Sequence, residues 1–354
     1  MMTVTASAAG LAFSVAAFSA FPPSGASTGC AISRRRLAFA ARALYLVALT
    51  RGACIAANRA RSTNRSLVTM ARAINRSIEP DAGATMKGND IRSGDAASRR
   101  WDSALEPLLG GPAGTLWRLH SDAINAALFA RWLPSEPCAN LLKTDLFDEA
   151  MGVGLYPLLS AHARRVAAID VAPTVLTAAR MRYPALLAAA ADVRCLPFAS
   201  ASFDVVVSNS TLDHFDTRDD IRASLRGFHR ILRPGGRLLL TMDNLANPAV
   251  ALRNALPYRL LHRLKLVAYP VGATAGPGRL RGMLEDAGFD VLQTVAMLHC
   301  PRALAVALAR RCERRGTPAA KARFLRSAAR WERLARWPTR YLTGYFIGID
   351  ARKP

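Results

Sequence analysis

The chain has 354 residues, of which 51% are hydrophobic, and a formal net charge of +23 at pH 7. This length suits one large domain with additions, or two modest ones, with a sizeable core. The charge is uneven: residues 1–85 carry +8, residues 86–299 carry +4 and residues 300–354 carry +11. The nearly balanced centre excludes the evenly basic surface that is typical of a nucleic-acid-binding domain.

The six cysteines, at positions 30, 54, 138, 195, 300 and 312, form no C-x-x-C pair and no metal-like cluster with histidine. We therefore expect free thiols, a reducing compartment such as the cytoplasm, and no metal site.

Residues 1–85 are rich in Ala, Ser and Arg, carry two acidic side chains and lack a steady helical or strand period. Their apolar runs are too short to span a bilayer. We interpret them as a disordered leader or as the product of a start codon placed too far upstream. An organelle transit peptide is the alternative that the composition leaves open.

Residues 86–141 are predicted to form a helical lead-in. A short amphipathic helix is expected at 98–109, and a second at 115–132, where Leu116, Ile124, Leu128 and Trp132 share a face. Within it, His120-Ser121-Asp122 is interpreted as a solvated or capping group, with a substrate contact as the alternative.

Residues 142–243 alternate apolar strands with helical segments, which predicts a doubly wound parallel sheet. Ligands in such sheets bind beyond the carboxyl ends of the strands. A strand near 142–145 runs into the loop 148–154, in which Gly152 and Gly154 would let the backbone approach a ligand. We therefore expect a nucleotide-like pocket at this edge.

Two further acids follow at regular intervals. Asp170 ends the strand 166–169, 22 residues after Asp148, at a place suited to binding both ribose hydroxyls. Asp192 follows a third strand at a similar interval, where it can accept from an exocyclic amine such as adenine N6. Together with their neighbours Val171 and Val193, they extend the expected pocket.

These residues resemble the class I S-adenosylmethionine-dependent methyltransferases, most closely the type 11 group that includes ubiquinone and menaquinone C-methyltransferases. The first motif of that family corresponds to Asp148-Glu149-Ala150-Met151-Gly152-Val153-Gly154, with Ala150 in the first glycine slot. Asp192 with Leu196-Pro197-Phe198, and the turn Leu232-Arg233-Pro234-Gly235-Gly236, are the most specific matches. The resemblance covers about residues 140–243. It implies a Rossmann-like seven-stranded sheet whose last strand is antiparallel, with S-adenosyl-L-methionine as cofactor.

The acids at the loop favour this cofactor over NAD for a physical reason. A dinucleotide needs a pyrophosphate site at the helix entrance, where Asp148 and Glu149 would repel it. A cationic sulfonium and an ammonium group would tolerate both carboxylates.

Polar residues follow the predicted buried strand 202–209. Asn209 is expected to contact the cofactor, and His214 is the candidate general base, because histidine titrates near neutral pH. A structural role for His214 is the alternative. No Asn-Pro-Pro-Tyr-like element follows this strand, which argues against amino methylation of nucleic acid or glutamine.

Two helical cap insertions are expected on the acceptor side of a methyltransferase domain spanning 142–350, at about 244–278 and 300–338. A helix at 280–287 and strands at 291–298 and 341–349 complete the sheet. The helix at 318–337 places apolar residues on one face and arginines elsewhere. Packing against the sheet is the favoured interpretation, and peripheral contact with an anionic membrane is the alternative.

The sequence thus predicts an enzyme that transfers a methyl group from S-adenosyl-L-methionine to a small-molecule acceptor, lipid-like or glycosidic, without a nucleic-acid partner. The alternatives are an RNA or protein methyltransferase that uses the basic termini, and a catalytically silent cofactor-binding paralogue.

Overall fold

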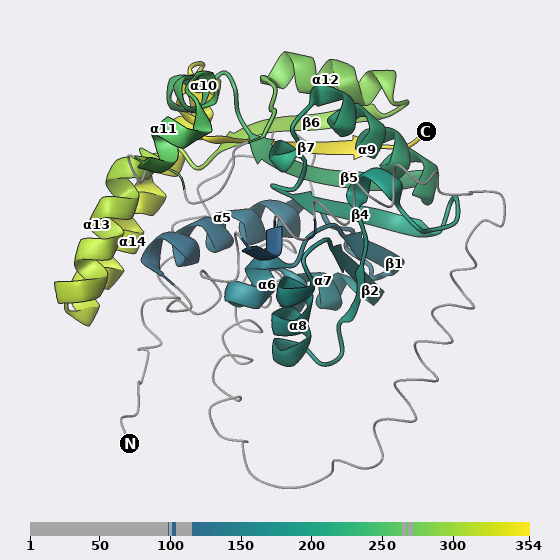
Figure 1. Ribbon diagram of the computed structural model, residues 1–354, viewed down its shortest axis with the longest axis horizontal. Coiled ribbons are helices and arrows are strands. Elements are labelled where there is room, and N and C mark those ends of the chain that lie inside the picture. The colour runs from purple at the N-terminus through teal and green to yellow at the C-terminus, as the bar shows by residue number, and fades with distance from the viewer. Residues whose placement is uncertain (1–97, 99–100, 104–114, 264–266, 268–271) are drawn as a thin grey trace, which may run out of the picture.

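The computed structural model describes residues 98, 101–103, 115–263, 267 and 272–354. The leader predicted for 1–85 and most of the helix predicted for 98–109 lie outside these residues. The described residues form a mixed seven-stranded sheet surrounded by helices (Figure 1). The strands are β1 Cys138–Lys143, β2 Ala163–Asp170, β3 Leu187–Ala190, β4 Phe203–Asn209, β5 Leu232–Asp243, β6 Asp290–Met297 and β7 Phe346–Arg352.

The strand order is β3-β2-β1-β4-β5-β7-β6. Strands β1 to β5 pair in parallel, whereas β7 is antiparallel to both β5 and β6. The predicted doubly wound, Rossmann-like sheet with an antiparallel last strand is therefore confirmed. The order reverses between β1 and β4, so the chain forms the topological switch point at which such sheets bind ligands.

The helices connect and cover these strands. They are α5 Leu116–Trp132, α6 Phe147–Met151, α7 Tyr156–His162, α8 Pro173–Arg182, α9 Arg218–Ile231, α10 Pro248–Ala255, α11 Tyr258–Arg263, α12 Pro277–Asp286, α13 Arg302–Arg315, α14 Pro318–Arg330 and α15 Arg340–Thr343. Short 3₁₀ helices occur at η2 Val193–Cys195, η3 Leu212–His214 and η4 Trp331–Arg336.

Both faces of the sheet carry a core. In β4, Val206 packs with the α9 and α12 side, while Val205 and Val207 pack with the α5 and α7 side. This alternation follows from the two-residue period of a strand. Because both faces are covered, the strand is apolar from Val205 to Val207 and becomes polar again at Ser208 and Asn209, where it reaches the ligand edge.

The predicted helix 115–132 is confirmed as α5. Thr115 caps it by accepting from the N–H of Arg118. The predicted strand 341–349 is partly wrong, because residues 340–343 form α15 and the strand starts at Phe346. The Gly344 N–H donates to the Arg340 carbonyl, which closes that helical turn.

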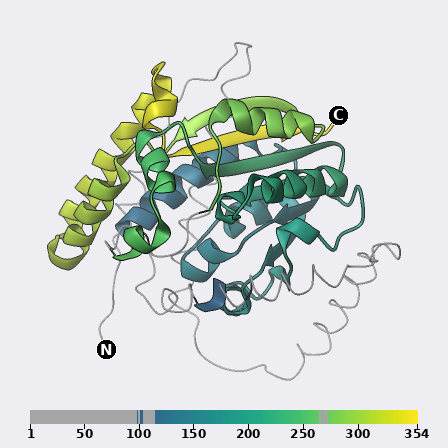
Figure 2. The same ribbon diagram turned by 45° about the horizontal axis from the view of Figure 1, so that its top comes forward.

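The insertions are helical. Helices α10 and α11 lie within 244–278, and α13 and α14 form a hairpin within 300–338 (Figures 1 and 2). Ala328 and Ala329 of α14 are buried, whereas Trp331 and Trp337 are 42% and 60% exposed. Membrane contact by this segment remains a prediction. No helix in the described ranges is long and apolar enough to cross a bilayer.

In the polar group on α5, His120 is not solvated, in contrast to the interpretation favoured from the sequence, while Ser121 and Asp122 are half-buried. His120 is 1% exposed, and neither ring nitrogen has a hydrogen-bond partner among the described residues. Its ring lies 5.7 Å from that of Trp117, and burial lowers its pKa to about 4. His120 is therefore neutral in the folded protein well below the pH at which a free histidine takes up a proton.

His120→Leu is expected to reduce acid destabilisation. The unfolded chain protonates this histidine below about pH 6.5 but the folded protein only near pH 4, so stability falls as pH drops through that window, by about 3 kcal/mol. Urea unfolding at pH 4.5 and 7.5 measures the difference. The exposed His262 provides the control, since His262→Leu should keep the parent's pH dependence. An unchanged pH dependence in His120→Leu would contradict this account.

Candidate functional site

The carboxyl ends of the parallel strands open on a cavity of about 320 Å³. It extends from the residues after β2 and β3, across the ends of β1 and β4, to Leu298 and Phe346 beside β6 and β7. Helix α5 contributes Trp117 and Arg118. The predicted site residues that line it are Asp148, Asp170, Val171, Asp192, Val193, Asn209 and His214.

Gly152 and Gly154 are not among the residues that line this cavity, and their contact with the cofactor remains a prediction. The first part of the expected loop is helical, because α6 covers Phe147–Met151 and brings Phe147 and Asp148 to the cavity wall, while the two glycines follow in the bend before α7. Gly154 has φ +59°, and a Cβ there would lie 2.6 Å from the carboxyl carbon of Glu149. This glycine makes room for a protein side chain.

A buried ion pair holds α6 and the residues that follow it in place. Lys143, at the end of β1, is 1% exposed, and its Nζ lies 2.9 Å from Oε2 of the fully buried Glu149. The other oxygen of Glu149 accepts from the N–H groups of Leu155 and Tyr156 at 2.8 and 3.0 Å. Burial lowers the pKa of Lys143, but Asp145 and Glu149 outweigh it and raise that pKa. Glu149 thus ties β1 to the start of α7.

Asp148 also has its partners within the protein. Its two oxygens accept from Arg118 Nη1 at 2.7 Å and from Asn209 Nδ2 at 2.9 Å. Thr241 Oγ1 in turn donates to Asn209 Oδ1, which sets the orientation of the amide. The argument that Asp148 and Glu149 repel a pyrophosphate is therefore wrong as stated, because both carboxylates face protein cations.

Asp170 lies where the second strand ends, as expected. It is 8% exposed, and its oxygens accept from the N–H groups of Leu146 and Ala172, both at 2.8 Å. Burial raises its pKa, against the effect of those two donors. Each carboxylate oxygen has a second lone pair, so the group can still accept from ligand hydroxyls. Its ribose contact remains a prediction.

Asp192 interacts with its own neighbour in the chain. It accepts from the backbone N–H of Arg194 at 2.9 Å and forms an ion pair with that guanidinium at 2.6 Å. The guanidinium carbon of Arg194 lies 5.6 Å from the centre of the Phe215 ring. The end of the cavity near Asp192 therefore contains an acid–arginine pair beside an aromatic ring. Binding of adenine N6 by Asp192 remains a prediction.

His214 lines the cavity, and its ring lies edge-on to that of Trp101, with centroids 5.0 Å apart. Its role as a base remains a prediction. Asp145, which was not among the predicted site residues, also lines the cavity. Its Oδ1 lies 3.4 Å from Lys143 Nζ, and burial raises its pKa to about 7 despite that lysine. The signal for it was a charged residue two positions after the end of a buried strand.

The donor set fits a nucleoside with a positively charged tail. Carboxylates follow β1, β2 and β3, and the two arginines at this end, Arg118 and Arg194, are each paired with an acid. Hydroxyls and amines thus find acceptors there, and a pyrophosphate finds both arginines occupied. Within the described residues, no three His, Cys, Asp or Glu side chains group together to hold a metal.

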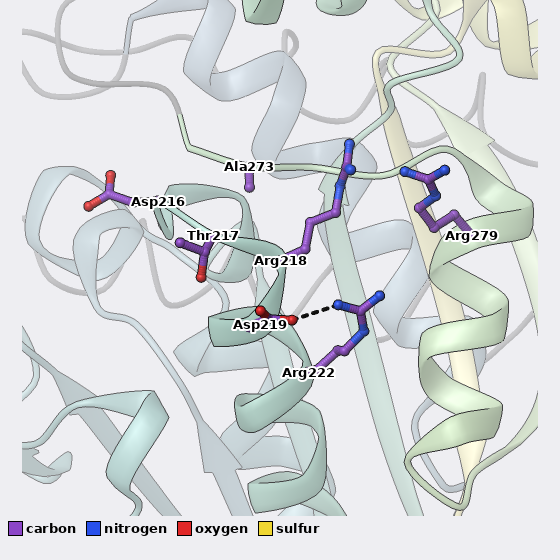
Figure 3. Close-up of a pocket in the computed structure, with 7 residues that line it drawn as sticks. All are labelled: Asp216, Thr217, Arg218, Asp219, Arg222, Ala273 and Arg279. Carbon is purple, nitrogen blue, oxygen red and sulfur yellow. Dashed lines mark hydrogen bonds and ion pairs between the residues drawn. The ribbon is translucent and has the colours of Figure 1, made fainter.

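A second, open hollow lies beside the cavity, between the starts of α9 and α12 (Figure 3). Asp216 lines both. Arg222 there pairs with Asp219 at 2.7 Å, and Arg279 projects from the first turn of α12. None of the predicted site residues lines this hollow.

Comparison with known proteins finds a family whose model matches part of the chain. Residues 147–240 match the family described as a methyltransferase domain, of type 11. A probable S-adenosylmethionine-dependent methyltransferase of Mycobacterium tuberculosis is 28% identical over 159 residues, 45% of this chain and 53% of that protein. A mouse EEF1A lysine methyltransferase is 32% identical over 132 residues, 33% of this chain and 51% of that protein. The chain thus spans about half the length of these relatives.

Solved structures resemble the fold at low sequence identity. An N-methyltransferase of Bradyrhizobium japonicum, in complex with S-adenosyl-L-homocysteine, aligns over 72% of this chain and 99% of its own, with 17% identity and a TM-score of 0.46. The matched domain at 147–240 lies within the sheet and ends in β5. Residues 147–240 thus match a methyltransferase domain of the type 11 family, and the Mycobacterium tuberculosis relative, matched over about half of its length, is described as S-adenosylmethionine-dependent.

Proposed function

We propose that this protein transfers a methyl group from S-adenosyl-L-methionine to a small-molecule acceptor. The observation that supports this most is the shape of the cavity, which continues past the acidic strand ends to an aromatic region at Trp117 and Phe346. Its volume of about 320 Å³ lies at the lower end of the range for small-molecule sites.

Residues at different positions in the cavity would bind different parts of the cofactor and the acceptor. Asp170 and Asp192 would hold the two ends of the adenosine, and the acidic groups after β1 would face the charged tail. When bound, the cofactor supplies an electrophilic methyl group on a sulfonium, which a positioned acceptor atom takes by in-line displacement. Trp117 and Phe346 exclude water from the acceptor side, and holding the acceptor in line contributes most of the catalysis.

An acceptor that is neutral at the reacting atom must lose a proton. Among the titratable groups that line the cavity, we assign this task to a ring nitrogen of His214 or to the carboxylate of Asp145. Because burial raises the pKa of Asp145 to about 7, that carboxylate can both take and return a proton near neutral pH.

Calorimetry with S-adenosyl-L-methionine tests cofactor binding, and labelled-methyl transfer tests the methylation of an acceptor. We expect micromolar-range binding and S-adenosylhomocysteine-sensitive labelling of the small-molecule fraction of host metabolite and lipid extracts. Label confined to RNA or protein, with binding that weakens steeply as salt rises, would instead support a macromolecular acceptor. Binding without labelling in any fraction would support the silent paralogue.

A further inference from the structure

The charges in the cavity are divided along the sheet. Strands β3 and β6 form opposite edges of the sheet, with β1 and β4 near its middle. The acids that line the cavity follow β1, β2, β3 and β4. At the other end, after β6, the charged lining residue is a cation, Arg302. The lining acids thus lie at the strand ends, where two of them pair with the lining residues Arg118 and Arg194, whereas the end after β6 carries the cation Arg302.

Arg302 is held in place by its surroundings. It is the first residue of the 14-residue helix α13, so the partial positive charge of a helix N-terminus adds to its own. Its guanidinium carbon lies 4.9 Å from the centre of the Tyr345 ring.

The neighbours of Arg302 in the cavity are mostly apolar. Trp117 packs against Cys300 and Ala305, on either side of Arg302 in the chain, and Phe346 packs in the cluster that contains Leu298. Leu298, Trp117 and Phe346 all line the cavity. The acceptor end thus combines an apolar wall with one guanidinium, a group whose planar fork matches a carboxylate.

We propose that the acceptor is an apolar or aromatic carboxylate, whose carboxylate group binds Arg302 and whose body packs between Trp117, Leu298 and Phe346. This inference rests on the proposed function and adds the class of acceptor. The carboxylate positions the molecule, and the apolar wall strengthens the ion pair by excluding water. An acceptor held at both ends in this way presents one reproducible face to the methyl donor.

The test uses the full chain saturated with S-adenosylhomocysteine and two matched pairs of probes, phenylacetate with phenylacetamide and octanoate with octanamide. Each pair differs in charge and little in shape. Titration calorimetry, with saturation-transfer NMR for weak binders, should show each carboxylate binding at least about tenfold tighter than its amide. Arg302→Met should bring that ratio close to one and leave the affinity for S-adenosylhomocysteine unchanged.

Arg279→Met is the matched control, because Arg279 also lies in the first turn of a helix but lines the other hollow. It should keep the parent's preference for carboxylates. Arg302→Lys, which retains the charge without the planar fork, should keep part of the preference for carboxylates. Because it changes the same position, it also serves as a control for a folding defect in the methionine variant. Equal binding of acid and amide by the parent, no binding of any probe, or an unchanged ratio in Arg302→Met would overturn the proposal. Failure to bind S-adenosylhomocysteine would instead overturn the proposed function.

Discussion

Lys143→Met is expected to lower the free energy of unfolding by about 3–5 kcal/mol, because it leaves Glu149 charged and buried without a cation. Asp145 loses the same partner at 3.4 Å. Urea unfolding at pH 7.5, followed by circular dichroism, measures the loss. We also expect binding of S-adenosyl-L-methionine to weaken, since α6 carries Asp148 and Phe147 to the cavity wall.

Two further variants separate the ion pair from packing. Lys143→Met combined with Glu149→Gln removes both charges, while the amide oxygen can still accept from Leu155 and Tyr156. We expect this double variant to regain a substantial part of the lost stability. Lys321→Met, on α14, should change stability by less than about 0.5 kcal/mol. A double variant no more stable than Lys143→Met would show that the ion pair is not the cause.

Asp170→Ala is expected to weaken binding of S-adenosyl-L-methionine about 100-fold or more. Two charge-assisted hydrogen bonds to ribose hydroxyls contribute roughly 3 kcal/mol together, and the alanine cannot accept either. Calorimetry below the onset of unfolding measures the affinity. Retained affinity would mean that the cofactor lies elsewhere in the cavity.

This substitution also leaves the N–H groups of Leu146 and Ala172 without their acceptor, so a loss of stability is expected as well. Asp350→Ala controls for it. Asp350 is a buried acid that pairs with Arg237 and does not line the cavity. Its loss should lower stability and leave cofactor affinity unchanged. A similar loss of affinity in Asp350→Ala would point to a general folding defect.

Much of the sheet could be predicted because its signals are local. The apolar run that becomes polar at Asn209 identifies β4 and its ligand end. Acids at the ends of successive parallel strands also predict that these acids lie close together. Since parallel strands end at the same edge, Asp170 and Asp192 line one cavity although they are 22 residues apart.

The cofactor loop could not be predicted because its structure depends on distant partners. Two glycines at alternate positions indicated a glycine loop, yet Gly154 has its conformation because Glu149 lies against it. Glu149 in turn is positioned by Lys143, and Asp148 by Arg118, 30 residues away on α5. A sequence shows each of these charges but not which ones pair. Asp148, Glu149 and Asp192 were therefore predicted as unpaired acids, whereas each of them forms an ion pair with a lysine or an arginine.

The position of β7 has a consequence for how the chain folds. This strand is the last of the seven in the chain, yet it lies between β5 and β6 and pairs with both. During synthesis, the ribosome must release residues beyond 346 before β6 has any partner. Until then, one edge of β5 and all of β6 present open backbone groups, which neighbouring chains can pair with. A low protein concentration or a chaperone should therefore reduce aggregation during folding, and mainly by protecting this half of the sheet.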